Sequence, residues 1–494
     1  MKNLLYIISL CGLLTACDLQ EEPYGFYSDD NFYKSETDAE SGLLYAYNAL
    51  TFLEYSRGIF YIGDIPTETM SPKSDEAGDV YQLENWIANR ETEQLQYYFK
   101  YCYIAINRAN TVIDHIQNSS VLSETARRRI LGEAYFLRAW NYFNLVRTFG
   151  IVPVQTKMVA KLSQTTPPMA TGLDQLYDLI LGDLTRADNL LEVNKVFGRA
   201  DKVAAQSLMA KAYLTIASSK EHNVHRYTEM RREPRIMYDS AAYWAGKVVR
   251  DYKNVYDFDT NLRDIYDVDK PTGPEHIFIM PIDRSGTQEG NYSKLPLLFL
   301  PSNNSVPFYI RYGNGDLQRA NGNGWGVFLC NDEFVETQFS TTDKRRTELI
   351  HRDIYDASGN PIVPNQVKGY FSSKYVDPDF IGERTSARPY LIRFSDIALV
   401  YAEAAGPEAG LAYVNRIRER AGVTPLPSGM TTDKFREAVI KERALELAFE
   451  GNRLYDLRRT ASVTTTDIKA AGLSEAEAAY YPIPQREIDL NPNL

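Results

Sequence analysis

The chain has 494 residues, of which 44% are hydrophobic and 24% are charged. These proportions are typical of a globular protein with a sizeable core, and they exclude a mainly disordered chain or one with many membrane spans. Acidic residues outnumber basic ones, 65 to 54, for a net charge of −11 at pH 7. A net-acidic chain lacks the basic footprint that binds a phosphate backbone, so nucleic acid is not expected as a partner.

Residues 1–16 have the pattern of a signal peptide. Lys2 precedes an apolar run over residues 4–14, which is too short to cross a bilayer as a stable helix. The run ends at Leu14-Thr15-Ala16-Cys17, which resembles a bacterial lipobox, in which the cysteine is acylated and becomes the mature N-terminus. The alternative is an ordinary cleaved signal with an incidental cysteine. We expect Cys17 to be lipidated, because several acyl chains, at about 0.8 kcal/mol per buried CH₂, anchor a protein stably.

The segment from 17 to 35 is expected to be a tether. Asp18, Glu21 and Glu22 follow the cysteine and are similar to the acidic export signal of Bacteroidota lipoproteins, which implies an outer-membrane protein facing the exterior. Once the signal is removed, Cys102 and Cys330 are the remaining thiols. Two distant cysteines do not make a disulfide framework, so we expect both to be buried as small apolar groups.

Residues 36–250 are expected to form a helical repeat region. The stretch 131–146 is apolar or aromatic almost all round a helix, as in a helix packed on several sides. Asp201 is a plausible N-cap of another helix. Helices that combine alanines with aromatic residues recur along the region, which indicates degenerate helical hairpins of the tetratricopeptide kind.

Residues 251–494 are expected to hold a loop-rich part followed by closing helices. Between 252 and 393 Pro and Gly are frequent, and a short strand is predicted at 276–280. Loop-rich regions of this length are usually functional. Helices are predicted again over 395–405, 406–421 and 432–460. The fold class is therefore mainly α, with helical hairpins packed against an irregular half.

Three carboxylates, Glu442, Glu446 and Glu450, are spaced to share one helix face. One possible role is catalytic: two of them could be the acid and base of a glycosidase, in which the two carboxyl groups are about 5–5.5 or 6.5–9.5 Å apart. The other possible role is structural: they could form ion pairs with interleaved arginines of the same stretch. We favour ion pairs with the arginines at 443, 453, 458 and 459, and we expect no catalytic residue.

No metal or cofactor is expected. His222 and His225 have a ligand-like spacing but no third ligand motif follows, and Asp377 with Asp379 is weak evidence for calcium. No phosphate-binding loop, dinucleotide-binding glycine pattern or nucleophile elbow is present in the sequence.

Aromatic residues in loops are the more promising candidates. Glycines around Trp325 leave its face uncovered, and Trp86 follows a polar loop. An indole or phenol ring stacks on a sugar ring while amide and guanidinium groups bond its hydroxyls. The alternative is that both tryptophans close the edge of the core, as we expect of Trp140 and Trp244. The candidate ligand-binding residues are Trp325, Trp86, Tyr309, Arg311, Asn323 and Tyr81.

Five segments together resemble the SusD/RagB family of outer-membrane nutrient-binding lipoproteins. They begin with Arg138-Ala139-Trp140, Leu391-Ile392-Arg393, Val414-Asn415-Arg416, Glu442-Arg443-Ala444 and Tyr481-Pro482-Ile483 and cover residues 138–153, 391–404, 414–422, 442–459 and 481–494. With the lipobox and the acidic start, the resemblance extends over essentially the whole chain.

The resemblance implies a non-catalytic protein that captures an oligosaccharide or polysaccharide at the cell surface. It also implies a partner, a TonB-dependent outer-membrane barrel of the SusC kind, to which the glycan is delivered for import. The alternatives are a peptide receptor of the same uptake system, a surface glycosidase, or a helical scaffold that acts through protein contacts alone.

Overall fold

The computed structural model describes residues 32–74, 78–284, 293–362, 369–382 and 384–494. Cys17 and the rest of the predicted signal and lipidation segment lie outside these ranges. Within the described ranges, no helix is both long and apolar enough to span a membrane.

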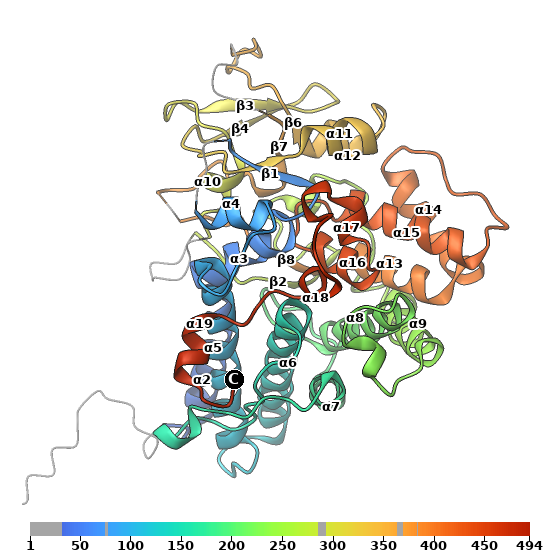
Figure 1. Ribbon diagram of the computed structural model, residues 1–494. Coiled ribbons are helices and arrows are strands. Elements are labelled where there is room, and N and C mark those ends of the chain that lie inside the picture. The colour runs from blue at the N-terminus through green and yellow to red at the C-terminus, as the bar shows by residue number, and fades with distance from the viewer. Residues whose placement is uncertain (1–31, 75–77, 285–292, 363–368, 383) are drawn as a thin grey trace, which may run out of the picture.

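The fold is mainly α, with tetratricopeptide-like helical packing in its first half. Neighbouring helices pack in series, α2 on α5, α5 on α6, α6 on α7, α7 on α8 and α8 on α9. Figure 1 shows these helices in the lower and right-hand parts of the molecule. Their bounds are α2 Glu36–Thr51, α3 Leu53–Gly63, α4 Asp79–Glu84, α5 Glu93–Ile116, α6 Glu124–Phe149, α7 Leu173–Leu190, α8 Lys202–Glu221 and α9 Pro234–Asp251.

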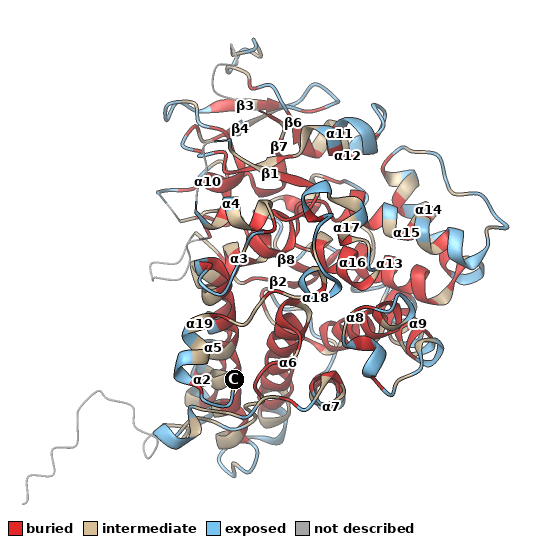
Figure 2. Cartoon of the chain, in the orientation of Figure 1, coloured by how far each residue is buried: buried red, intermediate tan, exposed pale blue. Residues whose placement is uncertain are grey.

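Helix α6 is the centre of the helical half, and it is buried on almost every side from Ile130 to Phe149 (Figure 2). Its polar groups are satisfied inside the core: the hydroxyl of Tyr55 donates to Asn141 at 2.9 Å and accepts from the indole N–H of Trp140 at 3.0 Å. Helix α8 begins as predicted, because the side chain of Asp201 accepts the backbone N–H of Ala204 at 3.0 Å. The predictions for α6, α8 and Trp140 are confirmed.

The second half of the chain is loop-rich up to residue 393, as predicted, and Figure 1 shows β3, β4, β6 and β7 at the top and β2 and β8 near the middle of the molecule. The four strand pairs among the described residues are antiparallel: β1 with β5, β2 with β8, β3 with β4, and β6 with β7. The strands are β1 Met70–Pro72, β2 His276–Ile279, β3 Phe308–Arg311, β4 Leu317–Ala320, β5 Phe328–Cys330, β6 Ile350–His351, β7 Phe371–Ser372 and β8 Tyr390–Arg393.

Ten further helices are described in this half, and α13 packs on α9, α14 and α15. The C-terminal tail returns to the helical half, where the N–H of Tyr481 bonds the carbonyl of Thr148 at 2.9 Å. The helices are α10 Leu295–Phe299, α11 Asp332–Gln338, α12 Lys344–Leu349, α13 Phe394–Ala405, α14 Pro407–Arg420, α15 Thr432–Glu446, α16 Arg453–Arg459, α17 Val463–Thr466, α18 Glu475–Ala479 and α19 Gln485–Leu490.

The helix predicted over 432–460 is interrupted, which corrects the assumption that three carboxylates share one helix face. Helix α15 ends at Glu446, and Phe449 and Gly451 have φ of +64° and +76° in the turn that follows. The turn brings Gly451 against the end of α3, where a Cβ on Gly63 would collide with its carbonyl oxygen. Close approach of two backbones is therefore the reason that the helix stops.

Asp64, which follows α3, also stabilises the contact between Gly63 and Gly451. It is fully buried after the end of α3, and its carboxylate accepts the N–H of Gly451 at 2.7 Å. Burial raises the pKa of Asp64 from 3.8 to about 7. The folded protein therefore keeps a proton that the unfolded chain releases above pH 4, and the Asp64 contribution to stability falls as the pH rises from about 4 through 7.

We expect Asp64→Asn to gain stability relative to the native protein as the pH rises. The amide oxygen still accepts from Gly451, but the side chain has no charge to bury. Between pH 5 and pH 8 the difference in the free energy of unfolding should grow by about 1–3 kcal/mol in favour of Asp64→Asn. Urea denaturation of both proteins at the two pH values measures it. A difference that does not change with pH would contradict the buried-carboxyl explanation.

Candidate functional site

The loop around Trp325 is held against α10 by its backbone. The N–H of Trp325 bonds the carbonyl of Leu297 at 2.6 Å, and the N–H of Gly326 bonds that of Leu300 at 2.9 Å. A Cβ on Gly324 would collide with the Leu300 carbonyl oxygen, and Gly326 has a φ of +60°. The glycines thus let the loop lie flat on α10, and the indole, 46% exposed, projects into solvent.

The indole has a cation beside it and an exposed amide in the same loop. The ammonium nitrogen of Lys294, the residue before α10, lies 5.5 Å from the Trp325 ring centre. Asn323 is exposed in the same loop. Sequence analysis predicted Asn323 as a candidate but missed Lys294, because the contact depends on how the loop folds over α10. A flat ring with a cation and an amide beside it can stack on one face of a ligand and hydrogen-bond its edges.

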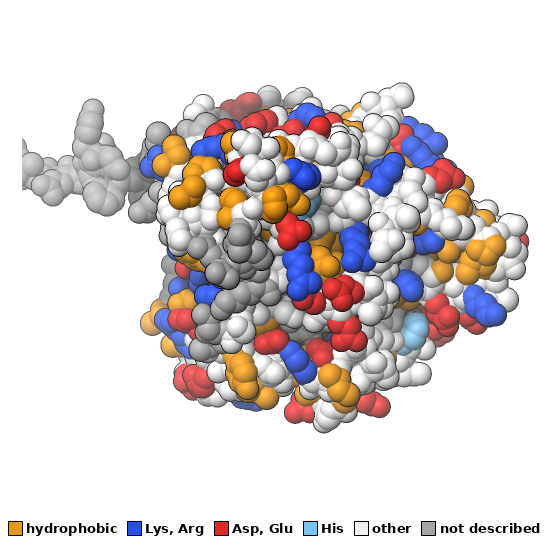
Figure 3. All heavy atoms as spheres, turned by 90° about the horizontal axis from the view of Figure 1, so that it is seen from above, with side chains coloured by type: hydrophobic (Ala, Val, Ile, Leu, Met, Phe, Trp, Pro, Cys, Tyr) orange, Lys and Arg blue, Asp and Glu red, His pale blue; other side chains and the backbone are white. Residues whose placement is uncertain are grey.

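Tyr81 lies on α4 and is 52% exposed. Helix α4 packs on β1, and β1 pairs with β5, which begins three residues after Trp325. The two-stranded ribbon therefore links the Tyr81 and Trp325 segments, although their side chains do not touch in the described structure. Figure 3 looks down on the loop-rich end and shows hydrophobic side chains among both acidic and basic ones.

Tyr309 and Arg311 lie on the β3–β4 hairpin and are engaged elsewhere. The backbone of Tyr309 pairs with that of Tyr355, with N···O distances of 2.7 and 2.9 Å. The guanidinium of Arg311 lies 4.3 Å from the Tyr355 ring centre and donates to the carbonyl of Gly359. The described contacts bind these two candidates to the 355–361 loop rather than to Trp325.

Trp86 is placed in the core, with 8% of its surface exposed. Its indole N–H donates to Asp467 at 3.2 Å, and its ring stacks on Tyr481 with centroids 6.2 Å apart. Both partners come from the C-terminal tail, nearly 400 positions along the chain, so sequence could not show that they cover it. Little of the ring is left for a ligand.

Trp244 and the two cysteines complete the predictions about buried residues. Cys102 and Cys330 are free and buried, as predicted, and burial raises the pKa of both thiols. Trp244 was expected at the edge of the core, and it is partly buried there, packed against the main core from α9. The ring centres of Trp244 and Tyr243 are 5.1 Å apart, and the ammonium of Lys247 lies 5.0 Å from the Trp244 ring centre.

The three glutamates belong to a buried charge cluster and not to an open site. Glu442, Glu446 and Glu450 are each at most 4% exposed. Their cations come from distant segments and not from the interleaved arginines that we predicted. The cluster joins Glu442 to Arg345 and Arg418, Glu446 to Arg345, Arg393 and Arg420, and Glu450 to Arg393 and Lys374.

The interleaved arginines pair with other carboxylates. Arg443 does so because residues one position apart on a helix point in different directions, and it therefore faces away from Glu442. Arg443 pairs with Asp396 and Asp456, and Arg459 pairs with Glu403. Asp377, considered above for calcium, is buried and accepts from Arg284 at 2.8 Å. No group of three or more potential metal ligands occurs among the residues that the structure describes.

Two family models match the chain in different parts. One, described as the SusD family, matches residues 353–494, and the other, described as starch-binding associating with outer membrane, matches residues 33–214. In both of these parts the chain is similar to the SusD/RagB family.

Relatives extend this similarity over nearly the whole chain. SusD-like protein P38 of Formosa agariphila is 26% identical over 521 residues, covering 99% of this chain and 97% of that protein. A SusD-like protein of Bacteroides ovatus is 25% identical, and the match covers 92% of this chain and 82% of that protein.

Solved structures share the fold. A SusD homolog of Bacteroides thetaiotaomicron superposes with a TM-score of 0.76 at 20% identity, covering 95% of this chain and 98% of that one. A laminarin-binding SusD-like protein has a TM-score of 0.73 at 23% identity, covering 93% and 98%. At these identities the likeness establishes the SusD/RagB architecture and leaves ligand chemistry to the residues of each chain.

Proposed function

We propose that this protein binds a glycan at the cell surface and delivers it to a TonB-dependent outer-membrane barrel of the SusC kind. The observation that carries the proposal is the Trp325 indole, which is half-exposed on a loop whose backbone is bonded to α10. The backbone of this loop is held before ligand arrives, so binding does not have to order the loop.

The chemistry around Trp325 suits a sugar. The apolar C–H face of a pyranose covers an indole, and the edge hydroxyls accept from a lysine ammonium and exchange hydrogen bonds with an amide. Lys294 lies beside the ring, and Asn323 is exposed two positions before Trp325 in the same loop. Tyr81, on the helix next to the β1–β5 ribbon, offers a second exposed ring for a longer chain.

The comparisons support the same class of ligand. One structural neighbour is named for binding laminarin, and one matching family model is described as starch-binding. That model is also described as associating with the outer membrane, which agrees with a lipid anchor at Cys17. We place the partner barrel in this proposal because the family resemblance implies it.

We propose that the protein binds its glycan without cleaving it. The carboxylates considered for glycosidase chemistry lie in the buried cluster, where each is paired with at least two cations. For Glu450, burial alone would raise the pKa, but Arg393 and Lys374 hold it below its ordinary value. A carboxyl that stays ionised and buried cannot reach a glycosidic oxygen to protonate it.

Affinity electrophoresis tests the proposal. The protein from residue 18 onward runs through native gels that contain plant, microbial or host polysaccharides, with a gel without polysaccharide as the reference. We expect retardation in at least one gel and no release of reducing ends from that polysaccharide on long incubation. Unchanged mobility in every gel would contradict glycan binding by the isolated protein, and released reducing ends would favour a glycosidase.

A further inference from the structure

One end of the helical half carries an exposed loop, residues 157–168, between α6 and α7. Leu162, which begins a single turn of 3₁₀ helix in this loop, is 85% exposed. The loop contains Lys157 and Lys161 and no acidic residue. Figure 1 shows it in blue-green at the lower left of the molecule, near α2. An exposed apolar side chain between lysines is the composition that binds the surface of an anionic bilayer.

The loop is held in place from both sides. On the side of α5, the N–H of Met158 bonds the carboxylate of Asp114 at 2.9 Å. On the side of the C-terminal tail, the amide of Asn493 donates to the carbonyl of Thr166 at 2.8 Å. Leu162 is therefore presented by a fixed backbone, and a surface that binds it does not have to order the loop.

The N-terminal tether enters the described structure at the same end. Tyr33 stacks on His115 of α5, with ring centres 4.5 Å apart. The preceding residue, Asp114, pairs with the ammonium of Lys157 at 2.9 Å. Fully extended, the chain from Cys17 to Tyr33 spans no more than about 55 Å. A lipid on Cys17 therefore keeps this end of the molecule close to the bilayer.

The C-terminal tail adds a second leucine beside the loop. Leu490, the last residue of α19, is 63% exposed. The amide of the next residue, Asn491, donates to the carbonyl of Pro167 at 2.9 Å, which places Leu490 next to the loop. The exposed carboxylate of Asp489 accepts from the amide of Gln485 at 2.8 Å. Two exposed leucines and two lysines thus lie at the end that carries the tether.

We propose that the 157–168 loop rests on an anionic bilayer surface, with Leu162 at the boundary of headgroups and acyl chains and the two lysines on the phosphates. The inference rests on the lipid anchor at Cys17 in the proposed function. One leucine and two lysines bind a bilayer only weakly by themselves, so the contact forms because the tether holds the loop near the lipid. The Trp325 loop lies on α10, at the opposite end in Figure 1, so the contact leaves the glycan site open.

Tryptophan reporters on a tethered protein test the contact. The chain from Cys17 onward is coupled through that cysteine to a maleimide phospholipid. Coupling is selective because Cys102 and Cys330 are buried and burial raises the pKa of both thiols. The vesicles are an equal mixture of phosphatidylcholine and phosphatidylglycerol, with or without bromine on the acyl chains, which quenches an indole that reaches them. Leu162→Trp and Ile468→Trp each add one indole to the native protein.

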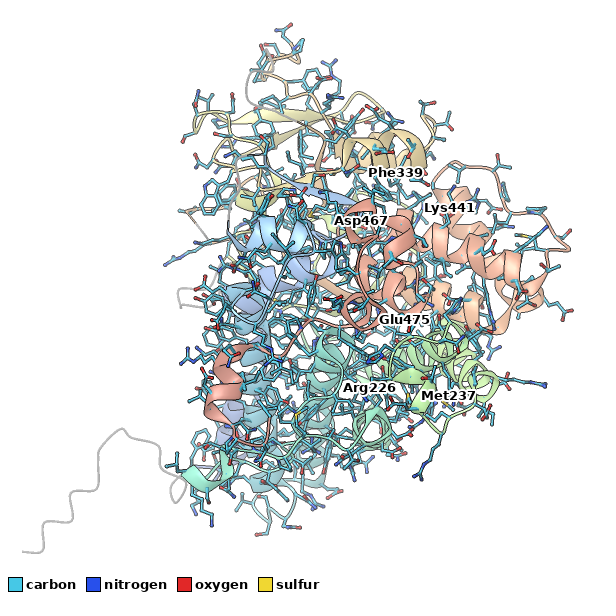
Figure 4. All side chains as sticks on the ribbon, viewed as in Figure 1. Arg226, Met237, Phe339, Lys441, Asp467 and Glu475 are labelled. Carbon is cyan, nitrogen blue, oxygen red and sulfur yellow. The ribbon has the colours of Figure 1, made fainter. Side chains whose placement is uncertain are left out.

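Ile468 is the matched control because it is as exposed as Leu162, at 86%, and lies far from the loop. Figure 4 labels Asp467, the residue before it, among the C-terminal helices in the upper half of the molecule. A contact that only reflects random motion on the tether would expose both indoles equally to the acyl chains.

We expect brominated lipid to lower the emission of the added indole about twofold or more in Leu162→Trp and by less than about a tenth in Ile468→Trp, because only the first enters the acyl boundary. Adding Lys161→Glu to Leu162→Trp should remove most of this quenching. Equal quenching of the two indoles, or no quenching in Leu162→Trp, would overturn the inference. Affinity electrophoresis of the native protein reports on glycan binding separately, so the two proposals fail independently.

Discussion

Arg393→Ala is expected to lower the free energy of unfolding by about 3–5 kcal/mol, because it removes a shared cation from three buried carboxylates. Arg393 is 1% exposed at the end of β8. Its guanidinium donates to Glu275 at 2.6 Å and to Glu450 at 2.8 Å, and also reaches Glu446 at 3.3 Å. Three carboxylates from two distant segments, Glu275 before β2 and Glu446 and Glu450 at or just after the end of α15, therefore share one side chain.

The rest of the cluster cannot compensate for its loss. Arg420 already pairs with Glu275 and Glu446, and Lys374 pairs with Glu450, so these cations are engaged and cannot also take up the oxygens that Arg393 leaves. For Glu275, burial raises the pKa, but Arg420 and Arg393 together hold it at about 2. The stability that this lowered pKa contributes is present at neutral pH and is lost as the pH falls through about 2.

Urea denaturation at pH 7 measures the effect, with Arg127→Ala as the matched control. Arg127 pairs with Glu124 on the surface of α6, where both side chains are open to solvent. Exposed pairs of this kind contribute about 0–1 kcal/mol, so the control should unfold almost as the native protein does. If Arg393→Ala were no less stable than Arg127→Ala, the buried cluster would not hold the loop-rich half to the C-terminal helices.

Local patterns predicted the helices well because the cause of each lies within the element. Apolar residues on every side of 131–146 indicated a central helix, and α6 is buried over that length. Asp201 precedes an apolar run, and it caps α8. In both cases neighbouring residues decide the structure, so sequence alone was enough.

Long-range contacts explain the predictions that were wrong. The helix over 432–460 is interrupted because Gly451 meets Gly63, almost 400 positions earlier. The partners of Glu442 are Arg345 and Arg418, and periodicity within α15 gives no information about either. The positions of the carboxylates on their helix could be predicted, but the source of their cations could not.

The same distinction applies to the candidate binding residues. Glycines around Trp325 indicated an uncovered ring, and the ring is half-exposed, because loop composition acts locally. The polar loop before Trp86 gave a similar indication, yet Asp467 and Tyr481 of the returning tail cover that ring. Exposure of a loop aromatic depends on whether a distant segment packs over it.

Trp325→Ala is expected to weaken glycan binding by about 1–3 kcal/mol, or about 5- to 150-fold in Kd, if the ring is the central anchor of the site. Stability should change by less than about 0.5 kcal/mol, since the indole projects from a loop that the backbone holds in place. Trp325→Phe keeps an aromatic face and should lose less affinity than the alanine variant.

Calorimetric titration of the retarding polysaccharide, or an oligosaccharide cut from it, tests the central claim most directly. The native protein, Trp325→Ala and Tyr243→Ala are compared, because Tyr243 is an equally exposed aromatic residue (55%) on α9, away from the Trp325 loop. The account predicts a large loss of affinity for Trp325→Ala, an unchanged Kd for Tyr243→Ala and nearly equal melting temperatures for all three. An unchanged Kd for Trp325→Ala would show that the glycan binds elsewhere.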